Sequence, residues 1–288
     1  MIVPAEENSL LAMPKPMRTM DAGRLHVHPD FLHLFESRGW MTAASILNAT
    51  DVEVFRRLPD RENARVRFAS PHASASPHGT SSRGECVAYL KRHQPSGAPL
   101  GRGPGFDEAE ASRWCEEAGV RTPTVIAFGH DDLGREFFLG QNLSGYEPSD
   151  DWLKRNEQQR CSMDRMTALL TSLGRTIGKL HSAGLFHRDL YWCHLFVREE
   201  RTASFDVRLI DLQRIHRPHR RRWRWRLKDL GQFVFSFPPG WASPGDLRTW
   251  FAAYLGKEKL SRSDMLLLEM VRWRARFYAW REKHRRSA

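Results

Sequence analysis

The segment His187–Val197, which reads HRDLYWCHLFV, gathers two imidazoles, an arginine and a carboxylate in one short stretch. A second carboxylate, Asp211, follows the apolar run Val207–Ile210. Phosphoryl transfer to a hydroxyl needs two such groups, because one carboxylate orients the attacking hydroxyl and another holds the metal ion on the nucleotide phosphates. The layout therefore predicts that Asp189 contacts the acceptor hydroxyl and that Asp211 is the metal ligand. The alternatives are that Asp189 caps backbone N–H groups of its loop and that Asp211 is a turn residue at the end of a strand.

Two histidines and an arginine flank these carboxylates. His194 follows Asp189 by five positions, where an oxygen ligand would suit magnesium better than an imidazole. We therefore expect His194 to position a phosphate or Asp211 unless it is purely structural. We expect His187 to be buried and hydrogen-bonded to backbone near Asp211. Arg188 either faces an anionic substrate or organises the loop.

A lysine in the first half of the chain is the candidate for contacting nucleotide phosphates. Lys91 lies in the strand-like run YLKRH, and a lysine emerging from a strand can reach the phosphates as a point charge. Its partner should be an acid on the next predicted helix, either Glu108 or Glu110. Glu108 is preferred because it shares a helix face with small, apolar residues. A solvated lysine and a helix-start acid are the alternatives.

The elements expected to position these side chains are helices and hairpins. Residues 162–183 carry apolar side chains at the helical period and end at Gly184, shortly before the catalytic segment. Residues 195–197 and 205–210 predict a hairpin that leads into Asp211. The first half of the chain predicts a strand at 85–91, a helix at 107–118, a hairpin of 125–128 and 136–139, and loops at 69–83 and 95–106.

These elements suggest a leader and two lobes. We expect residues 1–24 to be a flexible leader, residues 25–142 to form a nucleotide-binding N-lobe and residues 143–288 to form a catalytic and acceptor-binding C-lobe. Helices are expected from Lys228 onward, with a break near residues 238–245.

The basic composition points to an anionic partner. The formal net charge is +11, and Arg214–Lys228 holds eight basic residues, two tryptophans and no acid. That segment suits a phosphorylated sugar, an anionic lipid surface or RNA, although a solvated basic loop is the alternative. Residues 266–286 mix aromatic residues with arginines and could lie on a membrane or pack on the core. No run of about 18 apolar residues predicts a membrane span, and residues 1–16 do not resemble a secretion signal.

Four motifs together resemble the bacterial lipopolysaccharide kinases that phosphorylate heptose or Kdo sugars of the core. They are YLKRH (89–93), HRDLYWCHLFV (187–197), LIDLQR (209–214) and KDLGQFVFS (228–236). The resemblance runs from about Tyr89 to Ser236, and the catalytic segment is its most specific part.

The resemblance implies an α+β fold of the protein-kinase-like, two-lobed kind, with a small, mostly β N-lobe and a mostly helical C-lobe. It implies ATP and Mg²⁺ as cofactors, Asp189 as the catalytic base, Asp211 as the metal ligand and Lys91 as the phosphate-contacting lysine. It also implies an anionic glycolipid acceptor, the lipopolysaccharide core, and a cytoplasmic enzyme in peripheral contact with the inner face of the membrane. In that family a histidine at the position of His194 is normal.

The sequence departs from the wider kinase pattern in three places. No GxGxxG loop precedes Lys91, and residues 69–83 occupy the place where that loop is expected. Asp211 stands in IDLQ rather than DFG. Lys228 and Asp229 match a family motif, for which a structural ion pair is the interpretation.

Two other functions remain open from the sequence. One is a kinase of a different acceptor, either a protein or a small molecule. The other is a pseudokinase module whose arginines bind anionic lipid or nucleic acid, although nucleic acid is not the expected partner.

Overall fold

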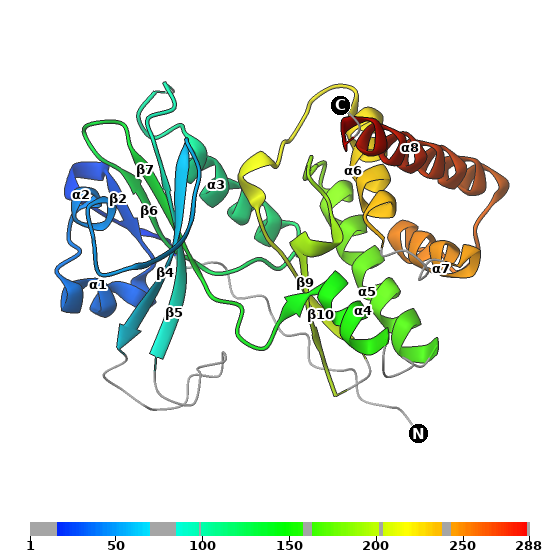
Figure 1. The fold of residues 1–288 in the computed structure, drawn as a ribbon, viewed down its shortest axis with the longest axis horizontal. Helices are drawn as coiled ribbons and strands as arrows, with labels where there is room; N and C mark the ends of the chain where they lie inside the picture. The colour runs from blue at the N-terminus through cyan, green and yellow to red at the C-terminus, as the bar shows by residue number, and fades with distance from the viewer. Residues whose placement is uncertain are drawn as a thin grey trace.

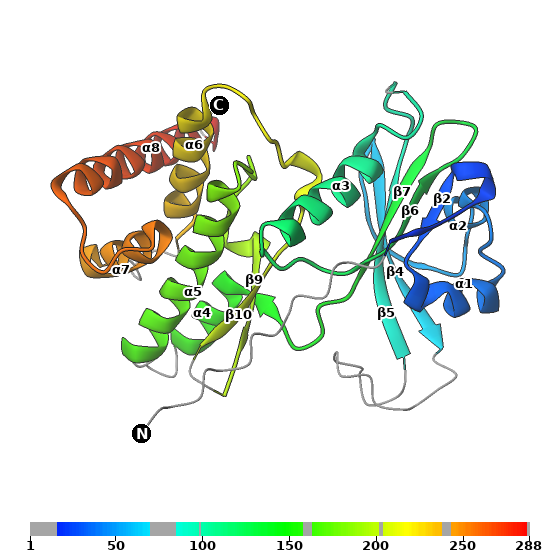
Figure 2. The same cartoon turned by 180° about the vertical axis from the view of Figure 1, so that it is seen from behind.

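The computed structural model describes residues 16–69, 85–97, 99–157, 163–201, 204–237 and 243–286. Figure 1 shows a sheet-rich lobe and a helix-rich lobe side by side, with α3 between them. The same division is clear from behind (Figure 2). The predicted α+β, two-lobed architecture is therefore confirmed.

The N-lobe is built on one antiparallel sheet with the strand order β1-β2-β6-β7-β5-β4-β3. Its strands are β1 (Arg18–Met20), β2 (Leu25–Val27), β3 (Glu53–Arg57), β4 (Arg61–Ala69), β5 (Glu85–His93), β6 (Val125–His130) and β7 (Glu136–Gln141). Its helices are η1 (Asp21–Gly23), η2 (Pro29–Phe31), α1 (Leu32–Arg38), α2 (Ala43–Leu47) and α3 (Pro104–Glu117). The inner strands pack apolar side chains against α1 and α2, and this forms a separate N-lobe core.

Part of the expected leader is ordered. Strand β1 pairs with β2, so that Arg18 lies opposite Val27 and Met20 opposite Leu25. This pairing places residues 18–20 at an edge of the sheet. The prediction of a flexible leader missed this short strand because its residues carry no strand-like alternation, and residues 1–15 of that leader lie outside the described residues.

The C-lobe is mostly helical. Its helices are α4 (Ser149–Glu157), α5 (Met163–Ser182), η3 (Trp192–His194), η4 (Leu212–Arg214), α6 (Arg222–Phe235), α7 (Pro244–Leu255) and α8 (Arg262–Arg286). A three-stranded sheet with the order β10-β9-β8 completes the lobe, from β8 (Glu147–Pro148), β9 (Leu195–Glu199) and β10 (Phe205–Leu209). The predicted helix at 162–183 and hairpin at 195–210 correspond to α5 and to β9 with β10.

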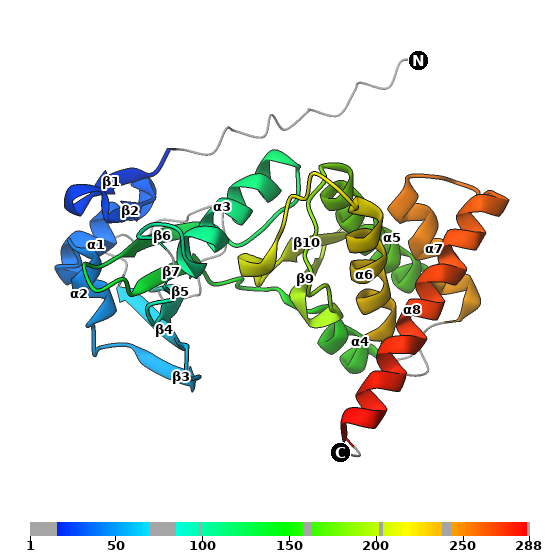
Figure 3. The same ribbon diagram turned by 90° about the horizontal axis from the view of Figure 1, so that it is seen from above.

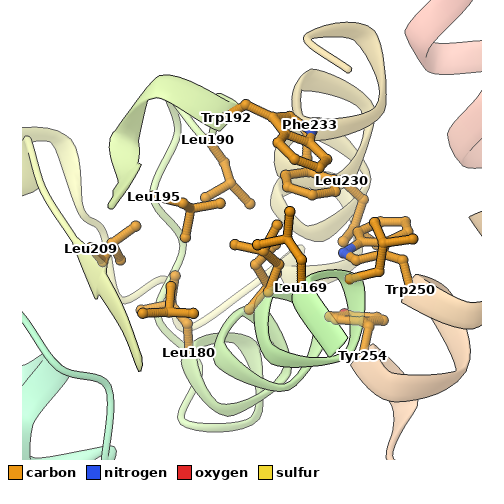
Figure 4. Packing of buried hydrophobic residues seen from close by; sticks show 14 of the residues in the cluster. Leu169, Leu180, Leu190, Trp192, Leu195, Leu209, Leu230, Phe233, Trp250 and Tyr254 are labelled. Carbon is orange, nitrogen blue, oxygen red and sulfur yellow. The ribbon is translucent and has the colours of Figure 1, made fainter. Parts of the chain in front are cut away.

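Helix α5 is the centre of the C-lobe core. Figure 4 shows Leu169 of α5 near Phe233 of α6 and Trp250 of α7, with Leu180 of the same helix on the side of Leu195 and Leu209. Gly174 of α5 permits close packing, because a Cβ there would lie 2.5 Å from the Trp250 carbonyl oxygen. Burying one large apolar side chain stabilises a fold by about 1.5–3 kcal/mol, so this core fixes the elements on either side of the catalytic segment.

The helices after the basic segment begin earlier than predicted. Helix α6 starts at Arg222 rather than near Lys228. Its first turn consists of arginines and tryptophans, which give no apolar period to detect. The predicted break at 238–245 falls largely outside the described residues, and α7 begins at Pro244. In the part of the chain that the structure describes, no helix has the length and apolar character needed to cross a membrane.

Candidate active site

Lys91 lies at the centre of an ion-pair cluster that joins the two lobes. It projects from β5, a strand paired on both sides by β4 and β7. Its Nζ lies 2.7 Å and 2.9 Å from the two carboxylate oxygens of Glu108 on α3, and 3.2 Å from Oδ1 of Asp211. Glu110, the other candidate acid, is exposed and pairs with Arg113 at 3.7 Å. The structure therefore gives Lys91 the partner that the helix face favoured.

The charges of this cluster hold Lys91 protonated and Asp211 ionised. Burial alone would lower the pKa of Lys91, but Glu108 and Asp211 outweigh it and leave that pKa raised. Burial alone would raise the pKa of Asp211, whereas Lys91 and His194 outweigh it and leave that pKa lowered. Asp211 also has a left-handed backbone, with φ of 58°, at the turn that follows β10. Strained backbone of this kind is frequent at functional sites.

Asp189 lies on the loop between α5 and η3 with its carboxylate partly open to solvent. Its Oδ2 accepts a hydrogen bond of 2.8 Å from the guanidinium of Arg214, and its Oδ1 lies 3.5 Å from Nε2 of Gln232. Gln232 also donates to the Tyr191 hydroxyl at 2.9 Å. These partners orient the carboxylate without enclosing it, so a hydroxyl can approach.

Asp229 of α6 anchors residues 187–191, the part of the loop between α5 and η3 that bears Asp189 and that we call the catalytic loop. Its two carboxylate oxygens accept the backbone N–H groups of His187 at 2.7 Å and Arg188 at 2.8 Å. Lys228 donates to the Arg188 carbonyl oxygen. The expected ion pair between Lys228 and Asp229 is therefore wrong. The two side chains bind opposite groups of the loop backbone, since neighbours on a helix point in different directions.

His187 and His194 connect the catalytic loop to the strand that ends at Asp211. His187 is buried, and its Nε2 lies 3.0 Å from the Ile210 carbonyl oxygen, as predicted. His194 Nδ1 lies 2.7 Å from the Asp189 carbonyl oxygen, and its Nε2 lies 3.9 Å from Oδ2 of Asp211. One imidazole thus spans the two candidate carboxylate residues, which places both of them in one site.

Arg188 faces away from the Lys91 cluster. Its guanidinium carbon lies 5.1 Å above the Trp225 ring, and its backbone is left-handed, with φ of 68°. It lines a cavity of about 330 Å³ that also includes Arg214, His216 and Trp114. Three arginines and two carboxylates, Asp107 and Glu110, share this cavity, and its Arg214 also pairs with Asp189.

A family model for the lipopolysaccharide kinase (Kdo/WaaP) family matches residues 51–266. The chain belongs to this family. The match covers both the Lys91 cluster and the catalytic loop. It confirms the prediction that this protein is a phosphotransferase of the lipopolysaccharide core kinase family.

Individual relatives agree with the family match. A lipopolysaccharide core heptose(I) kinase WaaP from Pseudomonas aeruginosa is 30% identical over 276 residues, which are 91% of this chain and 98% of the relative. The protein of the same name from Escherichia coli K12 is 24% identical over 228 residues, which are 76% of this chain and 84% of the relative. A solved structure titled "WaaP in complex with acyl carrier protein" has a TM-score of 0.65 at 23% identity. It covers 91% of this chain and 97% of that chain, and it supports the fold.

In this lipopolysaccharide kinase, the donor set fits a metal ion that is shared with nucleotide phosphates. No group of three or more His, Cys, Asp or Glu side chains with metal-binding geometry occurs among the described residues. Mg²⁺ is commonly held by one or two carboxylates together with substrate phosphates and waters. Asp211 offers one ionised carboxylate beside Lys91, so the residues present fit such a shared ion rather than an all-protein metal cage.

The tip of a different hairpin lies where the kinase phosphate loop was expected. In the sequence, residues 69–83 occupy the place where that loop is expected, but the flanking Ala69 and Glu85 pair at the end of β4 and β5 that is remote from Arg61 and His93. The β3–β4 turn, residues 58–60, lies at the end near the C-lobe. There Arg61 donates to Oε1 of Gln213 at 3.0 Å, across 152 positions of the chain. The turn contains no glycine, so no glycine-rich pattern could have marked it.

Proposed function

We propose that this lipopolysaccharide kinase transfers the terminal phosphoryl group of ATP, with Mg²⁺, to a hydroxyl of a heptose in the lipopolysaccharide core. The two curated relatives described above carry the name heptose(I) kinase. The observation that carries the proposal is the Lys91 cluster, in which one ammonium contacts Glu108 and Asp211 close to the loop that bears Asp189. Bound ATP would supply the phosphoryl group, and Mg²⁺ would supply the positive charge that neutralises the phosphate oxygens during transfer.

Each side chain has a distinct part in this proposal. Lys91, fixed by Glu108, contacts nucleotide phosphates, and Asp211 holds the metal ion. Asp189 accepts the hydrogen bond of the sugar hydroxyl and takes its proton, because its carboxylate is accessible and oriented by Arg214 and Gln232.

Of the three remaining predicted residues, His187 and His194 shape the loop and Arg188 faces the acceptor side. His187 fixes the loop against the Ile210 carbonyl, and His194 positions Asp211 relative to Asp189. The arginines around Asp189 favour an anionic acceptor. Arg188, Arg214 and Arg217 line one cavity, which Asp107 and Glu110 also line, and a guanidinium pairs well with phosphate or carboxylate groups. We propose that the acceptor is lipid-linked, so the enzyme works peripherally at the cytoplasmic face of the inner membrane.

The direct test compares Asp189→Asn with the parent protein on Mg-ATP and deacylated lipopolysaccharide core oligosaccharide. Mass analysis of the product measures the added phosphate. Loss of the base should lower turnover by about 10²–10⁴-fold, while stabilisation by Mg-ATP in a thermal-shift titration persists. Asp151→Asn, at an exposed helix position paired only with Lys154, is the matched control and should keep full turnover.

Two outcomes would contradict the proposal. Unchanged turnover in Asp189→Asn would remove that residue from the chemistry. A parent protein that neither phosphorylates the core nor gains stability with Mg-ATP would favour a pseudokinase. A core that lacks heptose tests the acceptor, since it should remain unphosphorylated.

A further inference from the structure

Helix α8 has one side packed on the C-lobe and an opposite side without cover. Leu268 and Val271 belong to the C-lobe core. Gly231 of α6 lets the helices approach closely, because a Cβ there would lie 2.5 Å from Cγ of Arg274. Figure 3 shows α8 along the outer side of the helical lobe. Its remaining face is therefore turned to solvent.

That outer face is apolar and aromatic over most of its length. Leu266, Met270, Trp273 and Trp280 are 69%, 49%, 62% and 56% exposed. Phe277 lies between the two tryptophan rings, with centroids 6.3 Å and 6.0 Å away. Spacings of four, three, four and three residues place all five on one side of a helix. We call these five residues the α8 stripe. A monomeric protein rarely leaves such a continuous apolar surface exposed unless something binds it.

Cationic side chains border the α8 stripe on both sides. The guanidinium carbons of Arg274 and Arg281 lie 5.3 Å and 5.9 Å from the Phe277 ring. On the other side lie Arg276 and Lys283, both exposed. The acid on that margin, Glu269, pairs with Arg272 at 2.6 Å. A helix with aromatic residues on its outer face and mostly basic residues along its margins matches the surface of an anionic bilayer. The rings enter the headgroup boundary, and the cations contact the lipid phosphates.

We propose that the α8 stripe docks this protein on an anionic membrane surface, with α8 lying in the plane of the headgroups. This inference rests on the proposed function only for the lipid-linked nature of the acceptor. The stripe and its charges are properties of the helix itself. Docking is peripheral, since none of the described helices can cross a membrane.

Helix α6 connects the docking helix with the catalytic loop. Helix α6 contacts α8 through Phe235, whose ring centroid lies 6.0 Å from that of Tyr278. The same helix contacts the catalytic loop through Gln232, which reaches Asp189 and Tyr191. The stripe lies on the side of α8 turned away from α6, so α8 and α6 both lie between the docking face and the loop that bears Asp189.

A second copy of this chain fits the face less well than a bilayer does. Two α8 helices packed face to face would bring their bordering arginines together, and like charges in contact are unfavourable. An acidic protein would satisfy those charges but would have to cover a stripe of five apolar side chains as well. The membrane supplies both the apolar depth and the anionic groups.

The test is sedimentation of the full chain with sucrose-loaded vesicles of phosphatidylglycerol and phosphatidylethanolamine, against vesicles of phosphatidylcholine alone. The parent protein should bind the anionic vesicles, and binding should weaken as salt rises. The double variant Trp273→Ser/Trp280→Ser should lower the partition coefficient at least tenfold, with the fold intact because both side chains face solvent. Leu133→Ser, which removes a 72% exposed side chain from the β6–β7 turn, is the matched control and should bind like the parent.

Activity assays separate this inference from the proposed function. The double variant should phosphorylate deacylated core oligosaccharide like the parent, but lose turnover on lipopolysaccharide embedded in anionic vesicles. Failure of the parent on the soluble acceptor would overturn the proposed function and leave the vesicle result standing. Equal vesicle binding by parent and double variant would overturn the docking face. The docking face would also be overturned if analytical ultracentrifugation showed a dimer for the parent and a monomer for the double variant. The same holds if an acidic protein bound the stripe while vesicles did not.

Discussion

Asp229 and Glu108 are both buried carboxylates beside the active-site loops, but different partners compensate their charges. Asp229 accepts backbone N–H groups of the catalytic loop at 2.7 Å and 2.8 Å, and it also lies 3.3 Å from Nε2 of His181. All of these groups belong to the C-lobe. Glu108 lies in the N-lobe and accepts only the ammonium of Lys91, which in turn contacts Asp211 of the C-lobe.

The catalytic loop is preorganised by contacts within one lobe, whereas the Lys91 cluster is preorganised by contacts between the two lobes. The catalytic loop is held inside one lobe, so its shape does not depend on how the lobes are arranged. The nucleotide-side cluster exists only when the N-lobe and C-lobe approach, because Asp211 reaches Lys91 across the boundary. Removing Asp229 should therefore damage folding first, whereas removing Glu108 should damage nucleotide binding first.

The largest expected effect on stability is that of Asp229→Asn. One acceptor oxygen becomes an NH₂ group that faces a backbone N–H donor, and hydrogen bonds to a buried charge are lost. Each such bond contributes about 1.5–3 kcal/mol, so the free energy of unfolding should fall by about 3 kcal/mol or more. Urea unfolding measures this change.

Asp132→Asn is the control for this substitution. Its carboxylate is 80% exposed and pairs only with Arg24 at the surface, so stability should change by less than about 1 kcal/mol. A similarly small change in Asp229→Asn would show that the catalytic loop has another anchor, and that Asp229 is not what holds it within the C-lobe.

A double-mutant cycle at Lys91 and Glu108 should give an intermediate effect. Glu108→Leu leaves a mostly buried ammonium without its main partner and should cost about 2–3 kcal/mol of unfolding free energy. Adding Lys91→Met should recover most of that loss, because an apolar pair can replace a buried ion pair with little net cost. The recovered double variant should nevertheless show no thermal shift with Mg-ATP.

That combination distinguishes a functional ion pair from a structural one. If the double variant recovered both stability and the Mg-ATP shift, Lys91 would have no part in nucleotide binding. If the double variant remained as unstable as Glu108→Leu, the loss would come from packing around α3 rather than from the unpaired charge.

The sequence predicted the parts of this site whose signals are local. The motif around Asp189 lies next to a strongly periodic helix, and both carboxylate positions follow from that helix and the strand before Asp211. The sequence predicted the pairing of Lys91 with Glu108 because Lys91 lies in a strand-like run and Glu108 lies on the apolar face of the next predicted helix. The two-lobed fold followed from the same motifs through the family resemblance.

What the sequence missed depends on contacts between distant segments. Asp229 lies some 40 positions beyond the loop it anchors, and the packing of α6 into the C-lobe core brings it there. The contact of Arg61 with Gln213 spans 152 positions and has no motif of its own. The start of α6 was hidden because an arginine-rich turn lacks an apolar period. This turn is exposed, and the helix packs on the core further along, through Leu230 and Phe233.

The smallest expected effect is a pH dependence on the nucleotide side of the comparison. Burial, and then the charges of Lys91 and Arg61, lower the pKa of His93 from 6.5 to about 4. Below pH 6.5 the unfolded chain binds a proton that the folded chain refuses, so this contribution to stability falls as pH falls from 6.5 toward 4. Between pH 7 and pH 5.5 it should cost about 1 kcal/mol. Urea unfolding across this range should show a shallower slope in His93→Gln than in the parent. Part of the slope should remain, because burial also lowers the pKa of His187 in the catalytic loop. An unchanged slope in His93→Gln would show that His93 makes no contribution, and would leave the effect to the other histidines whose pKa burial lowers, His26, His187 and His216.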